Sequence, residues 1–425
     1  MSDQIHEAGH PTRASTTTPP PLASLPRTGI TLIVLFLSVF AIYFVTAPRD
    51  VWSGDSIFYA MTARQLATKG SVDLSDQIVL SDPSADLSGS WLTRGPGGLV
   101  SHYPPGTAAL AAPFYLLDQE SPGALTMENV GNTNSEITIN VPSLVPATVV
   151  AAATTAAAVA ATFFLLGKLG ATRTEAVIGA LVLGFATGAW SVSSQRLWSH
   201  GPVMMWLILG LCFRETSRKA FAGLTDVAAV ITRPPTAVIG GIRTLMKAAR
   251  TRRLAPALQE VAWLVVGVAI IAIYNVVIVG SDPLLGGYAT VDDIQITRPD
   301  LGFFASNLTR ALLDPQRGVL IISPFIFWLL LGVRKGWGSA APWVKDAAVG
   351  GLVYFLIHNL THDFRGGDGY FGYRYPLEAV AVSFPLLFCS YRAWVKGNRF
   401  RVAGLIIALA VSVLLQAFGV ANQFG

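Results

Sequence analysis

Long apolar runs recur from near the start of the chain to its end, and they constrain the fold more than any other feature. The stretch from Val261 to Gly280 carries no charged side chain, and about 20 such residues are enough for a helix to cross a bilayer. Charged residues make up only 13% of the 425 residues, whereas a soluble domain carries about 25%. That polar surface is too small to cover a water-facing globule, so the sequence predicts a membrane protein.

The apolar runs predict an all-α polytopic fold with about ten or eleven membrane-spanning helices. The candidate spans lie at about 28–47, 141–167, 174–193, 199–217, 220–232, 235–247, 260–280, 317–333, 346–361, 376–393 and 402–420. The two spans on either side of Arg233 are short, so they are either broken or re-entrant helices or full crossings. Together the spans form one module, residues 28–420, after a tail of residues 1–27 that is rich in Pro, Ser and Thr and is predicted to be disordered.

Basic residues indicate the orientation of this module. With the N-terminus in the cytoplasm, alternating spans place most of the 30 Lys and Arg residues at cytoplasmic ends, which is the bias of inner-membrane proteins. The net charge of +5 is therefore a topology signal, and anionic lipid rather than nucleic acid is the expected partner of the basic ends. We predict a multi-pass protein of a bacterial inner (plasma) membrane with a periplasmic active face.

Three loops are predicted to be periplasmic, at residues 48–140, 281–316 and 358–375. The first is long and contains amphipathic helical stretches such as Ile57 to Leu66. Loops of this length are frequently functional. No internal repeat is visible in the sequence, which weighs against transporters built from inverted or parallel repeats.

Asp55 is the leading catalytic candidate, because it follows the first span closely and is preceded by Gly54. Glycine permits backbone angles that can aim the carboxylate back towards the bilayer. A carboxylate at that boundary can take a proton from an acceptor hydroxyl. The alternative is that Asp55 only caps the helix that follows it.

Further polar groups in the predicted outer segments can bind an anion. His102 and Tyr103 precede a Pro-Pro-Gly sequence, and Arg196 and His200 lie between two spans; cationic and imidazole groups suit a phosphate. Arg233 has no basic neighbour and falls on a face where the topology disfavours cations. For all of these residues the alternative is a turn or an interfacial side chain.

The densest polar cluster lies between residues 358 and 378, where arginines and aromatic rings alternate with glycines. Aromatic faces stack on sugars and Arg pairs with phosphate, so the cluster can form a pocket for a sugar phosphate; an aromatic belt at the membrane interface is the alternative. Its candidate residues are His362, Asp363, Arg365, Tyr373, Arg374 and Glu378. His362 and Asp363 can also be half of a metal site, but no complete ligand set is visible, so we predict neither a metal nor another cofactor.

The sequence also bears on the donor. It contains no Walker loop and no Gly-rich turn between a strand and a helix, which disfavours a nucleotide-linked donor. Chemistry on the periplasmic face is better served by a lipid-linked donor that arrives through the membrane.

The order of the outer motifs resembles the integral-membrane GT-C glycosyltransferases, in the branch with protein O-mannosyltransferases, aminoarabinose transferases and actinobacterial mannosyl- and arabinosyltransferases. The matching motifs are Gly54-Asp55, His102-Tyr103-Pro104-Pro105-Gly106, Thr232-Arg233-Pro234, Tyr274-Asn275, Asp314-Pro315-Gln316-Arg317-Gly318 and Gly372-Tyr373-Arg374-Tyr375. They cover nearly the whole chain after the tail. The resemblance implies a GT-C-like helical module whose first periplasmic loop carries amphipathic helices.

The resemblance also implies roles for individual residues. Asp55 takes the place of the family's general base, and Arg374, with Arg233 and Arg317, takes the place of the donor-phosphate ligands. Ser56 stands where many relatives carry a second acid, which disfavours a metal-dependent mechanism. The predicted substrate-binding residues are His102, Tyr103, Arg196, His200, Asn275, Tyr288, His362, Asp363, Arg365, Tyr373 and Glu378.

We therefore expect an inverting glycosyltransferase of the cell envelope. Its donor is a polyprenyl-phosphate sugar, with mannose or arabinose implied by the family, and its acceptor is a glycolipid, a glycan or a protein. One alternative is a transporter or flippase of lipid-linked sugars, which needs the buried polar groups but no base. A second alternative is a non-catalytic scaffold in envelope assembly.

Overall fold

The computed structural model describes residues 25–48, 53–87, 90–118, 123–127, 136–290, 300–367 and 369–422. Helix accounts for 71% and strand for 6%, so the predicted helical class is confirmed in outline. The predicted disordered tail, residues 1–27, falls almost wholly outside the described residues, because the first helix begins at Leu25.

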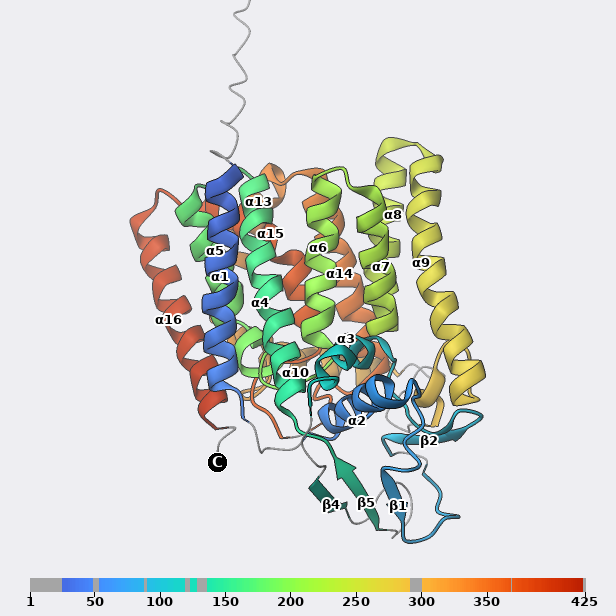
Figure 1. Cartoon of the computed structure of the whole chain (residues 1–425). Helices are drawn as coiled ribbons and strands as arrows, with labels where there is room; N and C mark the ends of the chain where they lie inside the picture. The colour runs from blue at the N-terminus through green and yellow to red at the C-terminus, as the bar shows by residue number, and fades with distance from the viewer. Residues whose placement is uncertain are drawn as a thin grey trace, which may run out of the picture.

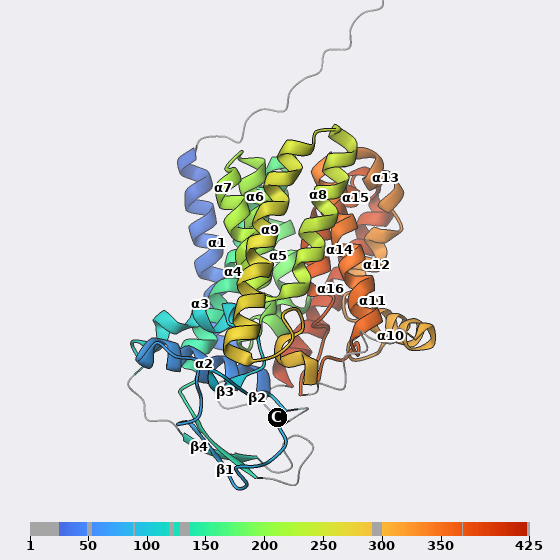
Figure 2. The same cartoon turned by 90° about the vertical axis from the view of Figure 1, so that its right-hand side faces the viewer.

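Roughly parallel helices form the body of the molecule, and α2, α3 and the strands cover one end of it (Figure 1). We call this end the sheet end and the other the opposite end. The α-helices are α1 (Leu25–Thr46), α2 (Gly54–Lys69), α3 (Gly106–Tyr115), α4 (Val145–Lys168), α5 (Arg173–Phe185), α6 (His200–Glu215), α7 (Lys219–Thr232), α8 (Ala237–Thr251), α9 (Leu254–Tyr274), α10 (Leu301–Leu313), α11 (Val319–Ile322), α12 (Pro324–Leu330), α13 (Val333–Ser339), α14 (Pro342–Thr361), α15 (Leu377–Ser390) and α16 (Arg399–Ala421). Helix α10 projects from the side of the body near the sheet end (Figure 2).

Within the described residues, four helical segments are long and apolar enough to cross a membrane. They are Thr28–Thr46, Val145–Lys168, Leu254–Val279 and Arg399–Ala421. Each coincides with a predicted span, and several large apolar side chains on three of them are exposed, as a lipid-facing surface requires. The structure thus supports a membrane protein, while the total of about ten or eleven spans stays a prediction.

Several of the other predicted spans are interrupted in the structure. The predicted span 174–193 is α5 followed by a π-helical turn, η1 (Ala189–Ser193). The span 317–333 is divided into α11 and α12, and α13 begins at its last residue. Proline opens α12 at Pro324, where its missing N–H costs no helical hydrogen bond. The two short predicted spans on either side of Arg233 are separate helices, α7 and α8, and a short 3-10 turn, η2 (Pro234–Thr236), joins them.

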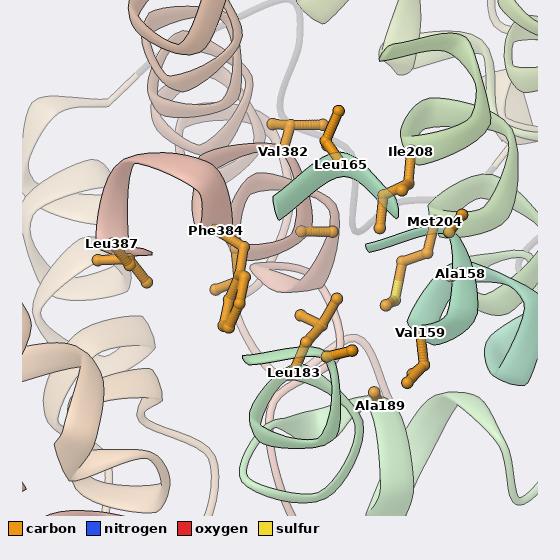
Figure 3. Packing of buried hydrophobic residues seen from close by; sticks show 14 of the residues in the cluster. Ala158, Val159, Leu165, Leu183, Ala189, Met204, Ile208, Val382, Phe384 and Leu387 are labelled. Atoms are coloured by element: carbon orange, nitrogen blue, oxygen red, sulfur yellow. The ribbon is translucent and has the colours of Figure 1, made fainter. Parts of the chain in front are cut away.

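The main core lies where α4, α5, α6 and α15 meet. Ala158 of α4, Leu183 of α5, Met204 of α6 and Phe384 of α15 are buried in one cluster (Figure 3). Small side chains on α4 allow close helix approach, which is how helices associate in a bilayer. This packing fixes the starts of α6 and α15, at His200 and Leu377, at the sheet end.

Two small antiparallel sheets lie at the sheet end, and the all-α prediction missed both. Strands β1 (Ile78–Leu80), β5 (Ile137–Val141) and β4 (Gly123–Met127) pair in the order β1-β5-β4, and β2 (Leu92–Gly95) forms a hairpin with β3 (Gly98–Ser101). Along β5 the buried residues alternate with half-buried ones, the period-two pattern of a strand with one covered face. The predicted span at 141–167 therefore begins later, at Val145 of α4.

Candidate active site

A cavity of about 320 Å³ lies at the sheet end, between α2, the segment before α3, the α7–η2 junction, α9 and the segment that follows α14. Residues from the first predicted periplasmic loop and from the last third of the chain line it together. The lining residues are Asp55, Tyr59, His102, Tyr103, Pro104, Ser199, Thr232, Arg233, Pro234, Pro235, Val268, Ile271, Asn275, Leu284, Leu285, Tyr288, His358, His362, Arg374 and Tyr375.

Close backbone contacts at glycines bring these segments together. A Cβ atom at Gly54 would lie 2.5 Å from the Trp91 ring, so the start of α2 fits against the hairpin only as glycine. A Cβ at Gly106 would lie 2.7 Å from the backbone of Thr232, so the start of α3 is seated directly on the end of α7. Gly54 therefore serves close packing, which corrects the expectation that it provides an unusual backbone angle.

Asp55 is held by two partners at once. The Tyr103 hydroxyl donates to Asp55 Oδ1 at 2.5 Å, and Arg374 Nη2 forms an ion pair with Asp55 Oδ2. The N-cap residue of α2 is Ser53, so the alternative that Asp55 only caps the helix is wrong. The carboxylate points to charged and phenolic partners from distant segments and not to the backbone of its own helix.

The network continues from Arg374 to a second acid. Arg374 Nε donates to His200 Nε2 at 3.1 Å, so the proton of the neutral ring lies on Nδ1 and is donated to Glu378 Oε1 at 2.7 Å. Glu378 Oε1 also lies 3.3 Å from Arg233 Nε. Two carboxylates and two guanidinium groups thus share one connected cluster, in which Glu378 and His200 are fully buried.

Aromatic rings cover both arginines. The guanidinium carbon of Arg374 lies 4.7 Å from the centre of the Trp198 ring, and the Tyr375 ring lies between the two cations, 5.5 Å from Arg374 and 5.2 Å from Arg233. Arg233 also donates to the Tyr354 hydroxyl at 2.9 Å. These contacts hold the two planar cations in fixed orientations, as bidentate recognition of an oxyanion requires.

Charges and burial shift the pKa values of the outer groups of the site. Burial alone would raise the pKa of Asp55, but the charge of Arg374 and the hydrogen bond from Tyr103 outweigh it, so the pKa lies below its usual value. Burial lowers the pKa of His102 to about 4 against the opposing charge of Asp55, and burial and Arg233 lower that of His362 to about 4. Near neutral pH the site therefore holds a carboxylate beside neutral imidazoles.

The structure brings most of the predicted site residues into or against this cavity. Those that line it are Asp55, His102, Tyr103, Arg233, Asn275, Tyr288, His362 and Arg374. His200 and Glu378 stand directly behind the lining and hold its arginines. Asn275 Nδ2 in addition donates to the carbonyl of Pro283 at 3.0 Å, which fixes the segment that carries Leu284 and Leu285.

The remaining predicted residues do not line the cavity. Arg317 donates to the carbonyl of Gly367 at 2.6 Å and Arg196 to that of Gly369 at 3.0 Å, so both hold the backbone of the glycine-rich segment before Arg374. Tyr373 is buried in the core, where its hydroxyl lies 3.0 Å from Ser323 Oγ. The structure thus places these three behind or beside the cavity, where they support its wall.

Asp363 and Arg365 likewise lie outside the cavity lining. Arg365 Nε and Asp363 Oδ1 are 3.1 Å apart, with Arg365 exposed and Asp363 half-buried. No group of three or more His, Cys, Asp and Glu side chains suited to a metal occurs in the described part of the chain.

Several cavity residues were not among the predicted site residues. Tyr59 lies one helical turn after Asp55, and His358 lies one turn before His362, so helical spacing could have placed both on the site face. Tyr375 directly follows Arg374. The apolar wall formed by Val268, Ile271, Leu284 and Leu285 gives no sequence signal, because such residues fill every membrane span.

A scan against protein-family models and a search of curated proteins found no match to this chain. The resemblance to GT-C glycosyltransferases therefore stays a prediction from the sequence motifs.

Proposed function

We propose that this protein is a GT-C-like glycosyltransferase that transfers a sugar from a polyprenyl-phosphate donor with inversion, on the periplasmic face of the membrane. The observation that carries the proposal is the pairing of Asp55 with Arg374 in a cavity that also holds Arg233. An acid beside two fixed guanidinium groups provides a base and an oxyanion site within one chamber. The acceptor is a cell-envelope glycolipid, glycan or protein.

In the proposed reaction Asp55 takes the proton of an acceptor hydroxyl, whose oxygen bonds to the anomeric carbon. The bond from that carbon to the phosphate oxygen breaks, and the phosphate leaves with the electron pair. Arg374 and Arg233 stabilise the charge that develops on it. Asp55 loses one negative charge as the phosphate gains one, so the total charge facing the two arginines is unchanged.

The ion pair between Asp55 and Arg374 also suggests how the base is kept inactive before the donor binds. Arg374 binds Asp55 and depresses its pKa, which makes the carboxylate a weak base. A donor phosphate competes for the same guanidinium N–H groups and draws them away from Asp55. Because the carboxylate is buried, the loss of its cation raises its pKa, and donor binding thereby activates the base.

Unpaired polar atoms support a ligand rich in hydroxyl groups. The buried His358 ring has one donor and one acceptor nitrogen when neutral, and neither has a hydrogen-bond partner among the described residues. Buried polar atoms are almost always hydrogen-bonded in folded proteins. His358 lines the cavity between His362, at 4.4 Å between ring centres, and Tyr375, at 4.0 Å, where sugar hydroxyls can donate to it.

The apolar wall supports a lipid-linked donor. Val268 and Ile271 belong to α9, one of the helices long enough to span a membrane, and Leu284 and Leu285 continue the wall. One side of the cavity is therefore charged and the other apolar, which suits a phosphate attached to an isoprenoid chain.

Replacement of Asp55 tests the proposal most directly. We expect Asp55→Asn to lower transfer from a radiolabelled polyprenyl-phosphate sugar by about 10²–10⁴-fold, because a general base contributes that much. The assay measures labelled product in membranes that contain equal amounts of each protein.

Asp363→Asn is the matched control, because Asp363 is an acid of the same predicted face that lies outside the cavity. Its transfer rate should stay near that of the wild type. Undiminished transfer by Asp55→Asn would refute the role of this acid, and donor translocation without product in proteoliposomes would favour a flippase.

A further inference from the structure

A second polar hollow lies at the opposite end of the bundle, between α7 and α9. Its volume is about 130 Å³. The lining residues from α7 are Lys219, Ala222, Gly223 and Asp226, and those from α9 are Pro256, Gln259, Glu260 and Trp263. Each set has the spacing of residues on one face of a helix. The hollow is therefore a groove between the facing sides of α7 and α9. Arg214, Ser217 and Lys247 form the rest of its lining.

The shape of this α7–α9 groove follows from small residues on α7. A Cβ atom at Gly223 would lie 2.3 Å from Trp263 Nε1, so the indole ring rests on the glycine backbone. Among the described residues, neither α7 nor α9 has a side-chain cap at its N-terminus. The first-turn N–H groups of α7 and those of Leu254 and Ala255 in α9 therefore remain available at the end of the groove where these helices begin; Pro256 has no N–H.

Positive charge is in excess around the groove. Asp226 binds Arg214 and lies 3.4 Å from Arg243, and Glu260 lies 2.5 Å from Lys247 and 3.2 Å from Arg243. Lys219 forms no ion pair with any described residue. Four cations thus face two carboxylates, and the buried Nε atom of Arg214 has no hydrogen-bond partner in the described part of the chain.

We infer that the α7–α9 groove binds a phosphate group, and that its source is the headgroup of an anionic lipid. The surplus of two positive charges matches a phosphate monoester dianion. Arg214 Nε, which lies 3.9 Å from Glu260 Oε2 and makes no hydrogen bond to a described residue, supplies a donor. The basic residues predict that this end faces the cytoplasmic leaflet, which is rich in anionic lipid.

The surfaces beside the groove favour a lipid over a free ion. Phe221 and Leu224 on α7 and Leu258 and Val261 on α9 are exposed next to the lining positions. These side chains can contact acyl chains while the headgroup phosphate enters the groove. The inference is independent of the proposed transferase activity, because no residue of the groove lines the cavity at the sheet end.

Native mass spectrometry of the purified full-length protein tests the inference. Phosphatidic acid, phosphatidylglycerol and phosphatidylcholine are each titrated into the protein in detergent. We expect one molecule of phosphatidic acid to bind with an affinity at least about tenfold above that of phosphatidylcholine, the ratio that one charge-assisted hydrogen bond provides. The double variant Lys219→Ala/Lys247→Ala and the single variant Lys219→Glu should lose this preference.

Controls separate the groove from general charge and from the active site. Lys335→Ala removes an exposed lysine of α13 that does not line the groove, and it should retain the preference, as should Asp55→Asn. A thermal shift with inorganic phosphate alone, lost in the same variants, would support the phosphate site and assign it to a soluble ion. Equal lipid binding by the wild type and both groove variants, with all of them folded, would overturn the inference.

Discussion

The two ends of the bundle both contain clusters of charged side chains, but the clusters differ in what they lack. At the sheet end two carboxylates balance two arginines, and the His358 ring, which lines a cavity of about 320 Å³, has no hydrogen-bond partner among the described residues. At the opposite end four cations outnumber two carboxylates, and Arg214 Nε likewise makes no hydrogen bond to a described residue. The first cluster therefore suits a ligand that carries hydroxyl groups beside its charge, and the second suits an anion that adds negative charge.

The difference also separates function from stability. During the proposed reaction Arg374 at the sheet end must release Asp55 and bind the donor phosphate. The charged side chains at the opposite end can keep their ion-pair partners throughout. Substitutions at the sheet end should therefore change rates more than stability, and those at the opposite end should do the reverse.

After the replacement of Asp55, the replacement of Arg374 should have the largest effect on the transfer rate. It therefore tests the difference between the two ends most strongly. Arg374→Lys keeps the charge but loses the planar fork that reaches both Asp55 and His200. We expect kcat to fall by about 10²-fold, the effect of losing one oxyanion donor. Steady-state transfer kinetics measure it.

Arg317→Lys is the matched control for that substitution. Arg317 holds the carbonyl of Gly367 outside the cavity, so its kcat should stay near the wild-type value. If Arg317→Lys were the more damaging variant, the donor phosphate would have to bind elsewhere.

Neutralisation of Glu260 probes the opposite end. Glu260→Gln leaves four cations with only Asp226 as a counter-charge, so we expect the free energy of unfolding to fall by about 1–3 kcal/mol, the cost of unpaired buried groups. The thermal midpoint in detergent should drop, while transfer per folded molecule should not change. A large loss of turnover with an unchanged midpoint would remove the distinction between the two ends.

Replacement of His358 tests whether its ring nitrogens contact the sugar of the donor. His358→Phe keeps a flat ring against His362 and Tyr375 but removes both nitrogens. We expect KM for the donor to rise by up to about tenfold, the value of one hydrogen bond, with a smaller change in kcat. His358→Gln, which keeps an acceptor, should recover part of the loss, and equal KM values in all three proteins would exclude a sugar contact.

The pH dependence of transfer should show the smallest effect. In the free enzyme Arg374 holds the pKa of Asp55 below its usual value, so kcat/KM should persist as the pH falls through the usual carboxyl range. With donor bound, the phosphate shares Arg374 and burial raises the Asp55 pKa, so kcat should begin to fall at a higher pH than kcat/KM. If kcat and kcat/KM began to fall at the same acidic pH, that result would contradict the proposed transfer of Arg374 from Asp55 to the donor phosphate.

Sequence patterns predicted the helical class and several of the residues that line the cavity. Asp55 and Arg374 stand out because charged side chains beside apolar spans need a partner. In the structure the two form an ion pair with each other. The exact spans were harder to predict, since Gly332 and Pro324 divide a run whose composition alone reads as one helix.

The strands and the supporting arginines could not be predicted for different reasons. Strand β5 is only five residues long and directly precedes an apolar run, so its alternation merges with the helix signal. Arg196 and Arg317 bind backbone carbonyls, and nothing in the sequence distinguishes such an arginine from one that binds a ligand.

The ion pair between Asp55 and Arg374 joins residues 319 positions apart. A ribosome makes the acid early and its cation late, so the nascent protein carries an unmatched carboxylate until α14 has been inserted. Every shorter translation product therefore lacks half of the proposed reaction centre. If the proposed function is correct, premature termination leaves inert fragments instead of ones that act on envelope precursors.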